Sequence, residues 1–106
     1  MTDQQKELEK IINYKFINKE LLIRSLIHKS YDNINNNEKL EFLGDRVLGL
    51  IISKRLIEIY PKEKEGIIDK KFANLVNKKT CSKISQKINL KEFMYLGSSH
   101  KSLLSL

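Results

Sequence analysis

Several residue types that constrain folds in special ways are scarce in this chain. It has one cysteine, one proline, four glycines and no tryptophan. Cys81 has no second cysteine to pair with, so the fold depends on packing and the compartment is expected to be reducing. Cys81 itself is predicted to be a buried structural thiol. No apolar run approaches the roughly 20 residues that a membrane span needs, and the polar start MTDQQKELEK excludes a secretory signal. We therefore expect a cytoplasmic protein without a membrane partner.

The period-two alternation of apolar and polar residues that marks β-strands is also missing. Apolar side chains recur instead at helical spacing, which predicts an all-α fold. A chain of 106 residues with 41% apolar content suffices for one small domain. We expect helices over residues 3–13, 19–30, 38–59 and 67–88, the last one broken near Asn77. The first two helices would turn Leu8, Ile11, Ile12, Leu22, Leu26 and Ile27 toward the core.

The predicted helix over residues 38–59 is apolar on nearly every side. Such a helix is either the buried centre of a domain or part of a subunit interface. Asn37 is well suited to cap its start through the side-chain oxygen. The helix should end before Pro61, because the residue preceding a proline disfavours the helical conformation.

The stretch NEKLEFLGD, residues 37–45, places Glu38, Glu41 and Asp45 within about 60° of one another on a helix surface. Helical carboxylates are often neutralised by Lys or Arg at i+3 or i+4, but no cation occupies those positions here. Gly44 lies between the second and third acid, although glycine inside a helix costs about 0.5–1 kcal/mol relative to alanine. A hard divalent cation such as Mg²⁺ would account for both features. A solvated polar face is the alternative that spacing leaves open.

The charge of the chain favours a polyanionic partner. Its 20 Lys and Arg residues exceed its 13 Asp and Glu residues, which gives a net charge of +7. Many of the lysines lie between residues 62 and 91, where aromatic residues that could stack on single-stranded bases are nearly absent. Duplex RNA is recognised mainly by shape and backbone, which needs no such aromatics. The sequence does not say which lysines would contact RNA, and a solvated basic surface stays open.

NEKLEFLGD resembles the signature of the ribonuclease III family, the double-strand-specific endoribonucleases. The stretches LIHKSYDN, RVLGLIISKRLIEIYP, EGIIDKKFANLVNKKTCSKISQKINL and YLG resemble the bacterial pattern in the same order, and the resemblance covers the chain from about Ile11. It implies the helical ribonuclease III endonuclease-domain fold. It also implies a homodimer with double-stranded RNA in a cleft that both subunits line.

The resemblance also assigns roles to individual residues. Glu41 and Asp45 match the family's metal-binding carboxylates, Glu38 matches an acid that assists them, and Glu65 matches a further catalytic acid. Phe42 matches an aromatic residue that packs across the dimer, whereas its ordinary reading is a core residue. The implied reaction is Mg²⁺-dependent phosphodiester hydrolysis, with Mn²⁺ as a substitute, that leaves 5′-phosphate and 3′-hydroxyl ends on ribosomal and other structured precursor RNAs.

The chain departs from the family pattern at its C-terminal end. The family's second acidic pair, an Asp and a Glu three residues later, is missing, and so is the double-stranded-RNA-binding domain. We expect residues 1–106 to be a partial catalytic domain that is inactive or impaired by itself. Leu103, Leu104 and Leu106 resemble the start of another buried element.

Other readings of the sequence are weaker. A catalytically inactive family member that only binds RNA or dimerises would explain the missing acids, but not the acids that are present. TCSKISQKINL resembles the first helix and turn of a helix-turn-helix DNA-binding module, yet KEFMYLG is too short and apolar for the recognition helix. Neither His28 nor His100 is needed for metal-dependent hydrolysis, and His28 is predicted to be a hydrogen-bonded structural residue.

Overall fold

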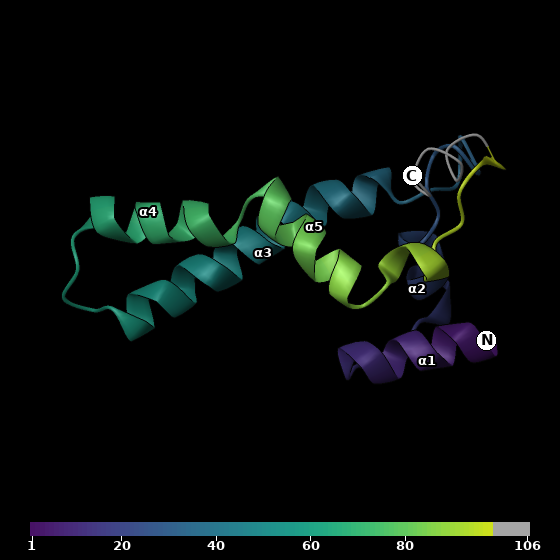
Figure 1. Ribbon diagram of the computed structural model, residues 1–106, viewed down its shortest axis with the longest axis horizontal. Helices are drawn as coiled ribbons and strands as arrows, with labels where there is room; N and C mark the ends of the chain where they lie inside the picture. Colours follow the sequence, from purple (N-terminus) through teal and green to yellow (C-terminus); the bar gives the residue numbers. More distant parts are fainter. Residues whose placement is uncertain (99–106) are drawn as a thin grey trace.

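The computed structural model describes residues 1–98, and the predicted element containing Leu103, Leu104 and Leu106, as well as His100, lies outside the described residues. The described part is all helical apart from one isolated bridge, which confirms the all-α prediction. Its elements are α1 (Asp3–Ile12), α2 (Lys19–Ser25), α3 (Glu38–Ile59), α4 (Glu65–Leu75), α5 (Lys78–Lys87) and the 3₁₀ turn η1 (Leu90–Phe93) (Figure 1). Over this part of the chain, no helix has the length and apolar character to cross a membrane.

Helices α1 and α2 and the turn η1 enclose the main core. These three elements are together called the N-terminal unit. A capping box between Thr2 and Gln5 starts α1, since each side chain bonds the other residue's backbone N–H. Leu8, Leu22 and Leu26 are 2%, 1% and 4% exposed. The partly buried residues packed against them are Phe16, Leu90, Phe93, Met94 and Tyr95. The core prediction is wrong for Ile11 and Ile12 of α1, which are exposed.

Helix α2 ends at Ser25, five residues before the predicted end at residue 30. The backbone N–H of Tyr95 donates to the carbonyl of Leu26 at 2.9 Å, and the N–H of His28 donates to the carbonyl of Tyr95 at 3.0 Å. Residues 26–28 therefore leave the helix and pair with a segment almost 70 positions away in sequence, an interaction that local propensity does not reveal.

Helix α3 begins after Asn37, but the predicted cap is wrong. The Asn37 side chain makes no capping bond and donates instead to the carbonyl of Ser25 at 3.0 Å. The neighbouring Asn36 takes over, because its Oδ1 accepts from the N–H of Glu38 at 3.1 Å. Helix α3 ends at Ile59, before Pro61, as predicted.

Helices α3 and α4 contact each other and form a hairpin that extends away from the N-terminal unit (Figure 1). The expected burial of α3 is wrong for the described residues, since Leu56 is its only buried residue. Leu50 and Ile51 are 70% and 58% exposed, because α4 covers only one side of the helix. The alternative expectation, a subunit interface, stays a prediction.

The predicted helix over residues 67–88 is broken at the expected place. Asn77 lies between α4 and α5, and its Oδ1 accepts from the N–H of Thr80 at 2.8 Å, which caps α5. Its Nδ2 donates to the carbonyls of Ala73 and Asn74, each at 2.9 Å. The Asn77 side chain thus bonds the last turn of α4 and caps the start of α5, which fixes the angle between the two helices.

Candidate metal centre

Glu41 and Asp45 lie on one groove of about 870 Å³ between α3 and α5. Their spacing of four residues places both on the same face of α3. The opposite wall includes Lys78 and Ser82 of α5. The other lining residues are Leu48, Val76, Asn77, Cys81, Ser85 and Leu90. The groove therefore has an acidic wall and a wall of amine, hydroxyl and thiol groups.

The acids of the groove are not neutralised by their neighbours. In residues 1–98 the ion pairs of α3 lie at its other end, where Glu58 bonds Lys54 at 2.8 Å and Arg55 at 3.4 Å. Arg46 directly follows Asp45, but its guanidinium lies over the Phe42 ring, with Cζ 3.8 Å from the centroid. These observations agree with the unpaired acids expected from the sequence.

The donor set of the groove suits a small hard cation. Mg²⁺ is bound in proteins through one or two carboxylates while it retains several waters, and two carboxylates one turn apart on an open groove satisfy that need. Throughout the described residues, no three Asp, Glu, His or Cys side chains come together as a metal site. Glu38, one turn before Glu41, does not line the groove.

Glu65 lies at the far end of the hairpin from this groove, at the first residue of α4 (Figure 1). Asp45 and Ile59 are separated by about 21 Å along α3 at 1.5 Å per residue, and Glu65 follows the loop after Ile59. The fold of one chain therefore does not bring Glu65 to Glu41 and Asp45. Its catalytic role stays a prediction.

Two residues of the signature helix have unexpected surroundings. Phe42 is 61% exposed, so the reading as a core residue is wrong, and the predicted contact across a dimer stays untested. A Cβ added at Gly44 would meet none of the described atoms within 4 Å. The cost of glycine at this position therefore has no explanation inside the described chain.

Cys81 is exposed and lines the groove, so its prediction as a buried thiol is wrong. Helix α5 turns this side chain toward the open groove rather than toward a packed core. The reading as helix-turn-helix also fails, because α5 is followed by a four-residue 3₁₀ turn and not by a second α-helix.

His28 is hydrogen-bonded, as expected, and lies away from the groove. Its Nδ1 is 2.7 Å from the Ser30 hydroxyl, and that oxygen accepts from the N–H of Gly97 at 3.0 Å. A Cβ on Gly97 would lie 2.5 Å from the Ser30 carbonyl oxygen, so this close approach requires glycine. These bonds connect residues 28–30 to the segment after η1.

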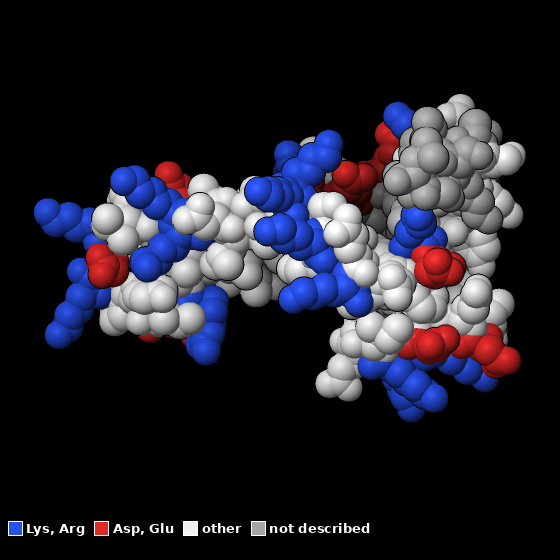
Figure 2. Space-filling view, viewed as in Figure 1, with Lys and Arg blue, Asp and Glu red and all other residues white. Residues whose placement is uncertain are grey.

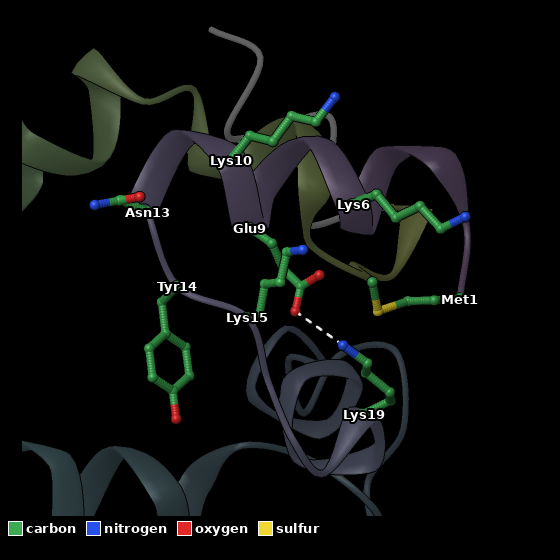
Figure 3. Close-up of a pocket in the computed structure, with 8 residues that line it drawn as sticks. All are labelled: Met1, Lys6, Glu9, Lys10, Asn13, Tyr14, Lys15 and Lys19. Carbon is green, nitrogen blue, oxygen red and sulfur yellow. Dashed lines mark hydrogen bonds and ion pairs between the residues drawn. The ribbon is translucent and has the colours of Figure 1, made fainter.

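A second hollow of about 650 Å³ lies between α1 and α2 (Figure 3). Glu9 is the one acid among the residues that line it, and the sequence pattern did not indicate a role for Glu9. Glu9 is 7% exposed. Its Oε2 accepts from the N–H of Phe16 at 2.6 Å and from Lys19 Nζ at 3.2 Å. The Phe16 bond, aided by Lys19 and opposed by burial, lowers the pKa of Glu9. Lys6 and Lys10 extend away from this carboxylate (Figure 3). The bonds of Glu9 to Phe16 and Lys19 therefore stabilise the contact between α1 and the start of α2 rather than forming a functional site.

Comparisons with family models and with curated proteins point to the same family. The family model described as Ribonuclease-III-like matches residues 18–105. The Ribonuclease 3 of Pelagibacter ubique is 61% identical over 88 residues, which cover 83% of this chain and 40% of that protein. The Ribonuclease 3 of a Sulfurovum species is 45% identical over 96 residues, covering 91% of this chain and 43% of that protein.

The fold also matches solved structures. The nuclease domain of ribonuclease III from Campylobacter jejuni superposes with a TM-score of 0.90 at 38% identity and covers 98% of this chain and 71% of that chain. A second structure of that domain, described as flexible in a region involved in dimer formation, has a TM-score of 0.89 at 39% identity, covering 94% and 70% of the two chains. The present chain spans about 40% of the length of the Pelagibacter relative.

Proposed function

The chain belongs to the ribonuclease-III-like family, and from that membership we propose that it forms part of a Mg²⁺-dependent endoribonuclease specific for double-stranded RNA. The observation that supports this most directly is the position of Glu41 and Asp45 on one open groove. The relatives are more than twice as long as the matched segment, so the activity belongs to the whole protein.

The residues of the groove have separable tasks. Glu41 and Asp45 would hold Mg²⁺, or Mn²⁺ as a substitute, and α3 keeps them about 6 Å apart along its axis. When bound, the ion would activate water and stabilise charge on the scissile phosphate and the leaving oxygen. Lys78, on the opposite wall, would attract and orient the phosphate. The products would carry 5′-phosphate and 3′-hydroxyl ends.

A homodimer is part of the proposal. The exposed apolar side chains of α3, among them Phe42, support an interface with a second copy. The distance of Glu65 from the groove in one chain supports a contribution of Glu65 to a site that two copies share. Glu38 would assist the two metal-binding acids of the groove. Structured precursors such as those of ribosomal RNA, met in the cytoplasm, are the proposed substrates.

The decisive experiment uses the whole reading frame that contains residues 1–106. Purified protein is incubated with duplex RNA and Mg²⁺, and Glu41→Ala and Asp45→Ala are compared with Asp69→Ala, which removes an exposed acid of α4 outside the groove. We expect the two groove variants to lose cleavage and the control to keep it. Undiminished Mg²⁺-dependent cleavage by both groove variants would show that the metal assignment is wrong.

The same preparation tests the inactive alternative. A parent protein that binds duplex RNA or dimerises without cutting it, in Mg²⁺ or Mn²⁺, would be a binding module of the family rather than a nuclease. Sequencing the DNA beyond the codon for Leu106 is a direct complement. An Asp and a Glu three residues apart within the following codons would support the intact nuclease, and an immediate stop codon would contradict it.

A further inference from the structure

Helix α5 has an unusual charge pattern. Its sequence, KKTCSKISQK, contains four lysines and no acid. Lys79, Lys83 and Lys87 recur every four residues, so they form a single stripe in which like charges face each other. Lys78 and Lys79 also lie in the first turn, where the helix dipole disfavours cations. The lysines of α5 therefore repel one another, and a mixture of acidic and basic residues would avoid this repulsion.

Some cations of the described residues have partners within the chain. Lys54 and Arg55 pair with Glu58, Lys71 lies over the Tyr60 ring, and Lys19 bonds Glu9. Lys79, Lys83 and Lys87 are exposed, and within residues 1–98 none of the three has an ion pair or a ring contact. Their charge is therefore available to a partner.

The stripe lies on the helix that forms one wall of the candidate metal centre, but on the outer side of that helix. At 100° per residue, Cys81, Ser82 and Ser85 lie within about 60° of Lys78, and all four line the groove. Lys79, Lys83 and Lys87 lie at about 100°, 140° and 180° from Lys78, on the side of the same helix that is turned away from the groove. Figure 2 shows basic side chains gathered over the middle of the molecule, where Figure 1 places α5. Helix α5 thus lines the groove with one side and presents a cationic stripe on the other.

We propose that Lys79, Lys83 and Lys87 bind the phosphate backbone of duplex RNA on the outer side of α5. This inference rests on the proposed function, since duplex RNA is the substrate proposed there. Lysine ammonium groups are compact point charges that suit phosphates, and successive stripe residues lie about 6 Å apart along the helix axis. Duplex RNA is recognised mainly through backbone and shape, so three amines without aromatic partners match its chemistry.

The test is a salt titration of duplex-RNA binding with a chelator present, so that no RNA is cut. The variant Lys79→Gln/Lys83→Gln/Lys87→Gln is compared with Lys6→Gln/Lys10→Gln/Lys15→Gln, which removes the same charge from exposed positions near α1. We expect the stripe variant to lose at least about tenfold in affinity at low salt, and its slope of log K against log salt to fall by about 1 for each lost phosphate contact. The α1 control should keep the parental slope.

Two further measurements keep the test decisive. Glutamine is a good helix former, and circular dichroism should show the parental helical content in the stripe variant. The matching Lys→Arg triple should retain the parental slope, since its charge is unchanged. A stripe variant that loses no more affinity and slope than the α1 control would overturn the proposal, as would equal loss in the Arg triple.

Failure of this inference differs from failure of the proposed function. If the parent cuts duplex RNA and Glu41→Ala abolishes cutting, while the stripe variant binds with the parental slope, only the assignment of the stripe is wrong. If Glu41→Ala and Asp45→Ala cut normally but the stripe variant loses binding, the metal centre is wrong and the RNA surface stands.

Discussion

The N-terminal unit buries apolar side chains in its core, whereas the α3–α4 hairpin leaves similar side chains exposed. Leu22 in the unit is 1% exposed, whereas Leu50 in the hairpin is 70% exposed. The difference lies in partners: α1, α2 and η1 surround a common core, while within residues 1–98 the main helical partner of α3 is α4. The better packed region contributes stability, and the candidate chemistry lies on the helix with the open surface. Substitutions in the two regions should therefore separate folding from function.

The largest expected contrast is in activity. Asp45→Ala in the hairpin should reduce Mg²⁺-dependent cleavage of duplex RNA by at least about 10³-fold, because loss of metal-assisted charge stabilisation costs several kcal/mol. Its thermal midpoint should not fall, since the substitution removes an unpaired like charge from α3. Cleavage kinetics and a thermal melt of the same preparation check this. Equal losses in both measurements would mean that Asp45 serves folding.

The next contrast concerns the core. In a polypeptide of residues 1–106, Leu22→Ala should lower the free energy of unfolding by about 2–5 kcal/mol, as expected for a fully buried leucine. Leu50→Ala should change it by less than about 0.5 kcal/mol. Urea denaturation at a concentration at which the polypeptide is monomeric measures both values. A large effect of Leu50→Ala there would mean that the open surface of α3 is covered in the single chain.

Two glycines provide a smaller contrast with opposite signs. Gly97→Ala should destabilise by about 1–3 kcal/mol, because the new Cβ would lie 2.5 Å from the Ser30 carbonyl oxygen. Gly44→Ala should stabilise by about 0.5–1 kcal/mol, since it improves helix propensity in open space. Chemical denaturation gives both signs. If Gly44 admits a ligand to the groove, Gly44→Ala will also lower cleavage while it raises stability.

The smallest expected contrast is in pH dependence. The pKa of Glu9 is lowered below 4.5 in the folded state, chiefly by the Phe16 N–H bond. Its contribution to stability is therefore present above pH 4.5 and is lost as the pH falls through the folded pKa. Glu9→Gln should flatten the acid limb of a stability–pH curve. Glu58→Gln in the hairpin should flatten it less, because the Lys54 and Arg55 bonds that lower the Glu58 pKa are exposed to solvent.

Local patterns in the sequence were sufficient for much of the fold. Helical periodicity predicted the all-α class, the proline predicted the end of α3, and Asn77 marked the break between α4 and α5. The acids of the groove were also recognisable, because Glu41 and Asp45 lack cations at the positions where helices usually provide them. Each of these features depends on residues within a few positions of one another.

Predictions failed where contacts between distant residues decide the structure. Helix α2 stops at Ser25 because Tyr95 pairs with the backbone that follows. Exposure of Cys81 depends on which way α5 turns against α3, and exposure of α3 depends on how many helices reach it. Glu9 was missed because its role requires the N–H of Phe16, which sequence alone does not place beside it.

The bond between Gln5 Nε2 and the Tyr95 hydroxyl, 3.0 Å long, spans 90 positions of the chain. Synthesis on the ribosome makes α1 first, yet its core partners in η1 and Tyr95 emerge last among the described elements. The α3–α4 hairpin needs only neighbouring segments and can form earlier. The region that begins the sequence is therefore the last to close, and the apolar surfaces of both regions are exposed together while the chain grows.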